Sequence, residues 1–144
     1  MDELTLEVTE KENAEVERYL SDAIFSYGIE QLRGQAPIKA FSCYRNGSGG
    51  IAGAAMGMAM RNLFFVSHLF VEPGYRKRGL GERLLSRMEQ SARRLGCDLL
   101  RLNTLNSKAH AFYLKSGFEQ TARIHDYMNG FDLIYYHKSI SPKA

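Results

Sequence analysis

The stretch Val71 to Leu85, VEPGYRKRGLGERLL, decides the fold, because an apolar run ends in it and a helical pattern begins. The apolar run starts at Leu63 and stops at Glu72-Pro73. A short loop follows, which carries three consecutive cations and then Gly79 and Gly81, and apolar residues at helical spacing come directly after it. The order is therefore a strand, a basic glycine-containing loop and a helix N-terminus.

This junction predicts a site for a phosphate-bearing ligand. The first turn of a helix leaves backbone N–H groups unpaired, and the helix dipole makes that end partly positive. Gly79 and Gly81 let the backbone approach a bound group, while the cations Arg76 to Arg78 raise the local potential. The pattern is neither GxxxxGK[ST] nor GxGxxG, because no third glycine follows. From the loop alone, an ordinary turn with a solvated basic surface is an equal alternative.

Length and composition predict one soluble globular domain that spans residues 1–144. The chain is 44% hydrophobic and 24% charged, which is ordinary for a globular protein. Its net charge is only +3, but cations crowd the centre of the chain while the first seventeen residues are mostly acidic. Local attraction for an anion is therefore better supported than a globally basic surface.

Neither a metal site nor a membrane segment is expected. Cys43 and Cys97 form no Cys/His cluster and lie among apolar neighbours, so both are predicted to be buried thiols in a reducing compartment. The N-terminus shows no charged-then-apolar leader, and the longest apolar run, Ile51 to Met60, is too short to span a bilayer. These features predict a cytoplasmic protein.

The segment before the loop reads as one strand, one helix and a three-stranded meander. Alternation at Leu4 to Val8 indicates a strand, and Thr9 with Glu12 fits a capping box. Helical spacing predicts a helix from about Asn13 to Gly28. The remaining strands expected before the loop are Ile38 to Arg45, Ile51 to Met60 and Leu63 to Val71, separated by turn residues.

The segment after the junction alternates helices and strands. The predicted elements are a helix Gly79 to Leu95, a strand Leu99 to Thr104, a helix Lys108 to Ser116, and strands Glu119 to His125 and Phe131 to Ser139, with a frayed tail SPKA. The central helix joins two strands, which the crossover rule makes parallel. The fold class is therefore a mixed sheet flanked by helices, in the α/β or α+β range.

Two motifs together resemble the GNAT superfamily of acyl-CoA-dependent N-acetyltransferases. The pattern Arg76-x-x-Gly79-x-Gly81 matches every fixed position of the family's loop, and Asn106 followed by the helix ending in FYLKSGF (Phe112 to Phe118) resembles its second signature. The segment before the loop, His68 to Arg76, is similar to the family's fourth strand. The resemblance implies a mostly antiparallel sheet of about seven strands that is splayed in the middle.

The resemblance also implies acetyl-CoA as co-substrate, with no metal. Backbone N–H groups of the loop and helix start would receive the pyrophosphate, and the last strand residues before the loop would pair with the pantetheine arm. The implied cofactor-binding residues are Leu69, Phe70, Val71, Arg76, Lys77, Arg78, Gly79, Leu80, Gly81, Glu82, Asn106, Ala109 and Phe112. The N–H of Phe70 or Val71 would polarise the thioester carbonyl.

Tyr113 is the residue expected to act as general acid. The departing thiolate needs a proton, and a tyrosine has a reference pKa of about 10 against about 8.5 for a thiol. The alternative is that Tyr113 only packs. His68 is the leading candidate for the base, since it lies on the strand that enters the site, and Glu72 or a water molecule are the alternatives.

The acceptor is expected to be a primary amine of a small molecule or peptide. Tyr27 and Arg33 lie where acceptor specificity is usual in the family, and Tyr127, in the final turn, is a further candidate to line the acceptor site. A homodimer is possible because relatives commonly dimerise. His110 is expected to face solvent. The alternative functions are a CoA-binding regulator without catalysis and a nucleic-acid-binding module. The lack of aromatics among the helix arginines disfavours the second.

Overall fold

The computed structural model describes residues 2–142, and the chain divides into two compact units, Met1–Gln35 and Ala36–Ala144. The first holds α1 (Ala14–Gln31) and the second all other elements. Each unit is defined by itself, so one domain over residues 1–144 stays a prediction. Part of the predicted frayed tail, residues 143–144, lies outside the described residues.

Helix α1 starts and ends at signals other than those predicted. Its N-cap is Asn13, whose Oδ1 accepts from Val16 N at 3.2 Å, so the capping box expected at Thr9 does not form. The helix also runs through Gly28 to Gln31. Gly34, with a φ of 79°, supplies the left-handed turn, and its N–H donates to Ile29 O at 2.8 Å.

The strand predicted at Leu4 to Val8 is wrong, because residues 2–9 hold no regular secondary structure. Alternating residues describe a strand only where another strand offers hydrogen bonds, and none pairs with this segment. The single sheet in residues 2–142 therefore has six strands rather than about seven, in the order β1-β2-β3-β4-β6-β5.

The sheet is mixed and mostly antiparallel, as predicted. Its strands are β1 (Ile38–Arg45), β2 (Ile51–Met60), β3 (Leu63–Val71), β4 (Leu99–Thr104), β5 (Glu119–Met128) and β6 (Phe131–Ser139). Strands β1 to β3 form one antiparallel meander, and β4, β6 and β5 form a second antiparallel block. The two blocks meet at β3 and β4, which are parallel as the crossover rule requires.

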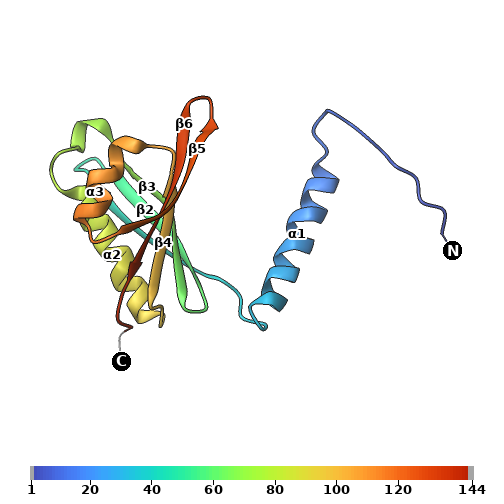
Figure 1. The fold of residues 1–144 in the computed structure, drawn as a ribbon, viewed down its shortest axis with the longest axis horizontal. Coiled ribbons are helices and arrows are strands. Elements are labelled where there is room, and N and C mark those ends of the chain that lie inside the picture. The colour runs from blue at the N-terminus through green and yellow to red at the C-terminus, as the bar shows by residue number, and fades with distance from the viewer. Residues whose placement is uncertain (1, 143–144) are drawn as a thin grey trace. The chain divides into compact units, whose positions relative to one another are not determined.

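Helices α2 (Leu80–Arg94) and α3 (His110–Lys115) lie on the same side of the sheet (Figure 1). The inward residues of α2 were predicted from their spacing, and Leu84, Leu85, Met88 and Ala92 are indeed buried. They pack with Phe64 and other sheet residues into one core. Of the two cysteines, Cys97 joins this core, whereas Cys43 is exposed, contrary to prediction.

Strand β3 carries a bulge. Val66 pairs with Gly57 and His68 with Met56, so Ser67 has no opposite residue. A bulge bends a strand and disturbs its pairing. A side chain at Gly57 would collide with the ring of Phe64, which explains the glycine inside β2.

The bulge coincides with the end of pairing between β3 and β4. Only Leu63 to Phe65 pair with Leu99 to Arg101, and beyond these three residue pairs the strands separate. This is the splay that the family resemblance implied. We call the opening between residues 66–71 of β3 and 102–104 of β4 the gap.

Candidate active site

The basic loop follows the open end of β3. A short 3-10 turn, η1 (Pro73–Tyr75), begins it. Lys77 and Gly79 then have positive φ angles of 63° and 80°. Left-handed residues beside a helix start turn neighbouring N–H groups towards one point, which is how backbone binds anions.

The N–H groups at the start of α2 are available for that purpose. The first helical bond runs from Arg83 N to Gly79 O at 3.1 Å, so the N–H groups of Leu80, Gly81 and Glu82 precede it. Gly79, the N-cap, makes no side-chain cap. The structure therefore places three predicted cofactor-binding residues with their N–H groups unused by the helix.

The three loop cations are exposed around this helix start. Arg76 donates from Nε to Val71 O at 2.8 Å, and its guanidinium lies 5.4 Å from the centre of the Phe70 ring. The guanidinium of Arg78 lies 5.3 Å from the Tyr75 ring. Two of the three cations are thus held near the loop while keeping their charge in solvent.

The second motif lies next to the first in space. A Cβ built on Gly81 would lie 3.6 Å from Phe112 Cζ and 3.9 Å from Val71 Cγ2. Strand β3, the start of α2 and helix α3 therefore meet at one place. Asn106 caps the turn η2 (Ser107–Ala109), because its Oδ1 accepts from Lys108 N at 3.1 Å. Its amide NH₂ end is then the donor that can reach a ligand.

Strand β3 presents backbone groups to the gap. Glu72 N donates to Ala52 O on β2 at 2.8 Å, and alternate residues of a strand point their backbone groups to opposite sides. Residues 70 and 72 thus face β2, while Leu69 and Val71 face the gap. Consistently, Val71 O accepts from Arg76 rather than from β2. Of the two predicted thioester donors, Val71 has the N–H with the suitable direction.

Tyr113 lies on the helix side of the sheet, packed against the core. Its ring contacts Phe112, Phe118 and Tyr136, with centroid distances of 5.1, 5.9 and 5.1 Å. Burial raises the pKa of the Tyr113 phenol above its ordinary value, and the neighbouring phenol of Tyr136 raises it further. The hydroxyl therefore holds its proton throughout the neutral range.

His68 lies on the other face of the sheet. Leu69 and Val71 pack against the core on the helix side, so the alternating residues His68 and Phe70 project from the opposite face. His68 is exposed, and its Nδ1 lies 2.9 Å from Ser67 Oγ. The predicted base and the predicted acid therefore belong to opposite faces of the sheet.

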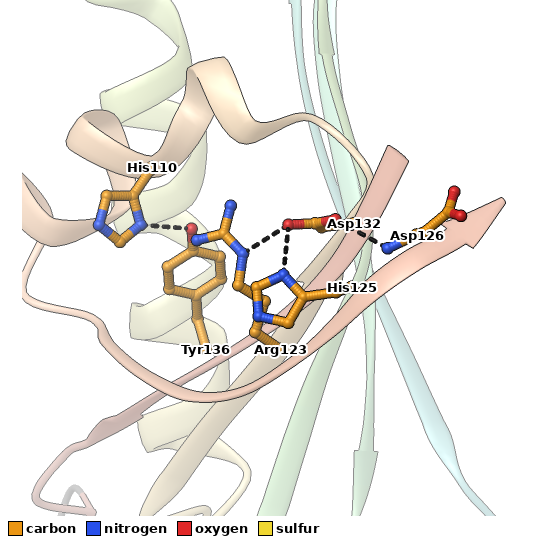
Figure 2. A network of polar contacts seen from close by, with 6 residues as sticks. All are labelled: His110, Arg123, His125, Asp126, Asp132 and Tyr136. Carbon is orange, nitrogen blue, oxygen red and sulfur yellow. Dashed lines mark hydrogen bonds and ion pairs between the residues drawn. The ribbon is translucent and has the colours of Figure 1, made fainter. Parts of the chain in front are cut away.

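Sequence reasoning missed a contact between His110 and Tyr136. The structure shows that His110 does not face open solvent, because its Nδ1 is 2.7 Å from the Tyr136 hydroxyl (Figure 2). Tyr136 comes from β6 and is only 1% exposed. No local pattern signals this pair, since its members are 26 positions apart; a buried tyrosine needs a polar partner, but the sequence does not say which.

The predicted acceptor residues are divided between the two units of the chain. Tyr27 and Arg33 belong to the unit Met1–Gln35, with Tyr27 in α1 and Arg33 just after it at a φ of 57°. Tyr127 lies near the end of β5 and is half exposed. These three residues stay predictions.

The β5–β6 hairpin beside Tyr127 is braced by Asp132 (Figure 2). Its Oδ2 accepts from Arg123 Nε at 2.8 Å and lies 3.3 Å from His125 Nδ1, and its Oδ1 accepts from Asp126 N at 2.9 Å. The backbone N–H of Asp126 and the Arg123 guanidinium hold the pKa of Asp132 below its ordinary value. These polar groups bond to one another within the hairpin, and the cluster therefore shapes the hairpin tip.

Within residues 2–142, no three His, Cys, Asp or Glu side chains gather closely enough to hold a metal ion. Among the helices of residues 2–142, none has the length and apolar character needed to cross a bilayer.

Comparison with known sequences gives a consistent set of relatives. A family profile described as "Acetyltransferase (GNAT) domain" matches residues 38–120. A blasticidin-S acetyltransferase of Streptomyces morookaense is 34% identical over 96 residues, which cover 65% of this chain and 71% of that one. An acetyltransferase of Agrobacterium fabrum is 25% identical over 126 residues, covering 88% and 92% of the two chains.

Comparison with solved structures supports the same fold. A crystal structure of a candidate acetyltransferase from Agrobacterium tumefaciens superimposes with a TM-score of 0.84, covering 95% of this chain and all of the other. The two sequences are 23% identical, so the match supports the fold alone.

Proposed function

The chain belongs to the GNAT acetyltransferase family and is an acetyl-CoA-dependent N-acetyltransferase; on this premise we propose that it acetylates a primary amine of a small molecule or peptide by direct attack. The observation that carries the proposal is the gap. It separates β3 from β4 beyond Phe65, with the basic loop at one end and α3 on the helix side.

The donor would bind by its phosphates and its amides. The pyrophosphate would lie against the N–H groups of residues Arg78 to Glu82, beside Arg76 and Lys77. The pantetheine arm would lie along the gap, where Leu69 and Val71 offer backbone groups in the manner of an added strand. Asn106, Ala109 and Phe112 would contact the arm from the other side.

The reaction would then form one bond and break another. The amine nitrogen attacks the thioester carbonyl carbon, whose oxygen takes up charge near the Val71 N–H. The C–N bond forms, the C–S bond breaks, and the amine loses a proton to His68, Glu72 or water. We favour His68, because it stands on the face opposite Tyr113, where an amine can approach while the sulfur departs.

Tyr113 would act on the departing sulfur. Its raised pKa makes complete proton transfer to a thiolate unfavourable, because the thiol is the stronger acid. A hydrogen bond that shares the proton while negative charge develops on sulfur is therefore the form of acid catalysis that fits. The same raised pKa keeps the hydroxyl protonated and able to donate.

The acceptor proposal draws on the relative named as a blasticidin-S acetyltransferase, whose substrate is a small molecule. Tyr27, Arg33 and Tyr127 are proposed acceptor contacts. A cytoplasmic location and a homodimeric state complete the proposal.

The test is an acceptor panel that follows CoA thiol release. Blasticidin S, polyamines, amino acids and peptides with free N-termini are offered to the wild-type protein, with hydrolysis in the absence of amine as background. We expect release to depend on one class of amine. Binding of acetyl-CoA by calorimetry without release for any amine would instead favour the non-catalytic regulator.

A further inference from the structure

Helix α3 is too short to fix its own orientation. It has six residues, and none of them is buried. A helix of this length is marginal without tertiary contacts. The direction of the Tyr113 side chain must therefore be set by whatever attaches α3 to the sheet.

Tyr136 on β6 provides that attachment. Its ring is almost fully buried, and its hydroxyl bonds to His110 Nδ1 at 2.7 Å (Figure 2). The same ring lies 5.1 Å from the Tyr113 ring at an interplanar angle of 40°. His110 and Tyr113 are three positions apart, so they share one face of α3. One buried side chain thus contacts both residues.

We propose that Tyr136 and His110 are positioning residues for Tyr113, fixing the direction of its phenol through a part-buried hydrogen bond and a ring contact. The inference rests on the proposed function in one respect only, namely that the phenol of Tyr113 acts on the leaving sulfur. The positioning itself is a property of the folded protein and has its own measurement.

The hydroxyl of Tyr136 matters because packing of its ring alone would leave α3 free to rotate about its axis. The ring already lies in the core, and a phenylalanine would fill nearly the same space. A hydrogen bond adds direction, because its strength falls steeply when donor and acceptor are misaligned. The hydrogen bond therefore fixes the rotation of α3 about its own axis, and this rotation sets the direction of the Tyr113 side chain.

The decisive variants are at His110, because no ring contact joins His110 to Tyr113. Asparagine can place a polar atom close to the position of Nδ1, whereas alanine cannot. Alanine is, however, the better helix former. If His110 only stabilised α3, His110→Ala would be milder than His110→Asn. A positioning role predicts the reverse order, so the two variants separate the explanations.

The first readout is NMR of ring-labelled tyrosine in the full chain, with the Tyr113 signals assigned from Tyr113→Phe. We expect one narrow set of Tyr113 ring signals in the wild type, broadened or doubled signals in His110→Ala, and recovery in His110→Asn. The control is Tyr135→Phe, because Tyr135 neighbours Tyr136 on β6 but is 36% exposed. Unchanged Tyr113 signals in His110→Ala would overturn the proposal.

The second readout is turnover with the best acceptor. His110→Ala and Tyr136→Phe are each expected to lower kcat about fivefold with the KM for acetyl-CoA unchanged, as loss of one part-buried hydrogen bond would. The double variant should be no slower than either single one, because both remove the same bond. Additive losses would count against a shared role.

The two proposals fail in different ways. If Tyr113→Phe turns over like the wild type, the acid role of Tyr113 falls, while the NMR signals still decide whether His110 and Tyr136 position the ring. If Tyr113→Phe is slow but His110→Ala matches the wild type in both readouts, the acid role stands and the positioning proposal is wrong.

Discussion

The two ends of the gap are built from different materials. At the loop end, the groups that would hold the donor are backbone N–H groups of Leu80 to Glu82, surrounded by exposed cations. At the α3 end, the group that would act on the donor is the side chain of Tyr113, which Tyr136 and His110 would position through a ring contact and one short hydrogen bond. The first end would bind by charge and backbone shape, whereas the second would depend on the placement of a few side chains.

This difference separates what each end should tolerate. Binding of the donor at the loop should tolerate most side-chain substitutions but not a change of backbone conformation. Added salt should weaken that binding. The α3 end should be indifferent to salt but sensitive to a single hydroxyl. Substitutions that affect both ends alike would break the comparison.

The largest effect is expected at the α3 end. Tyr113→Phe removes one oxygen and should lower kcat about 100-fold, the low end of what a positioned acid contributes, with little change in the KM for acetyl-CoA. Steady-state kinetics at low and high salt measure it, and the loss should be the same in both. A kcat within twofold of the wild type would show that Tyr113 only packs.

The next effect tests the backbone of the loop. Gly79 has a φ of 80°, and a Cβ added to it would meet nothing within 4 Å, so Gly79→Ala costs only backbone strain, roughly 1–2 kcal/mol. We expect the KM for acetyl-CoA to rise about tenfold while kcat is kept. Gly74→Ala is the matched control, since Gly74 lies in the same loop in open space without a left-handed φ. Equal effects of the two variants would contradict the expectation.

A smaller effect tests the charge of the loop. Arg76→Gln should raise the KM for acetyl-CoA about threefold at low salt, and the difference should vanish near 1 M salt because exposed charges are screened. Glu82→Gln, which removes an anion from the first turn of α2, should lower the same KM. Opposite shifts of the KM that both disappear at high salt would support a charge-dependent loop end. Shifts of the KM that persist at high salt would contradict it.

The smallest expected effect is on the pH dependence of folding stability, to which the α3 end should contribute and the loop should not. Burial raises the pKa values of Tyr113 and Tyr136 in the folded state, so the unfolded chain loses these phenol protons first as pH rises. Their contribution to stability is therefore complete below about pH 10 and is lost as pH climbs through the folded pKa values.

Urea unfolding at about pH 8 and about pH 10.5 measures this loss. Tyr136→Phe should lose less stability across that interval than the wild type, because it has one fewer buried phenol. Arg76→Gln should lose the same amount as the wild type. If Tyr136→Phe kept the full wild-type loss, the alkaline sensitivity would come from elsewhere.

The sequence predicted those parts of the fold that depend on neighbours along the chain. Helix α2 was expected from its spacing, and its four buried residues came from the predicted face. The loop and the parallel crossover followed from the order of elements. The strand at Leu4 to Val8 failed because a strand exists only with a partner, which alternation cannot supply.

In the candidate site, too, the sequence predicted the local features but not the contacts between distant elements. Residues 79–82 have the expected helix-start geometry, and Gly79 can take the left-handed φ before the helix because it has no Cβ. The bond between His110 and Tyr136 joins α3 to β6, and nothing local to either residue indicates it. The choice of Val71 over Phe70 as the N–H facing the gap also required the strand register, which one residue of slippage would invert.

The seam of three residue pairs between β3 and β4 has a consequence for how the chain folds. The β1–β2–β3 meander and the β5–β6 hairpin are closed by short turns and can gain their pairing locally, whereas β4 pairs with both β3 and β6 through residues far apart in sequence. Long-range contacts are entropically costly and form late. The meander and the hairpin should therefore form first. Insertion of β4 between β3 and β6 would then limit the rate, so the gap is created in the last step of folding.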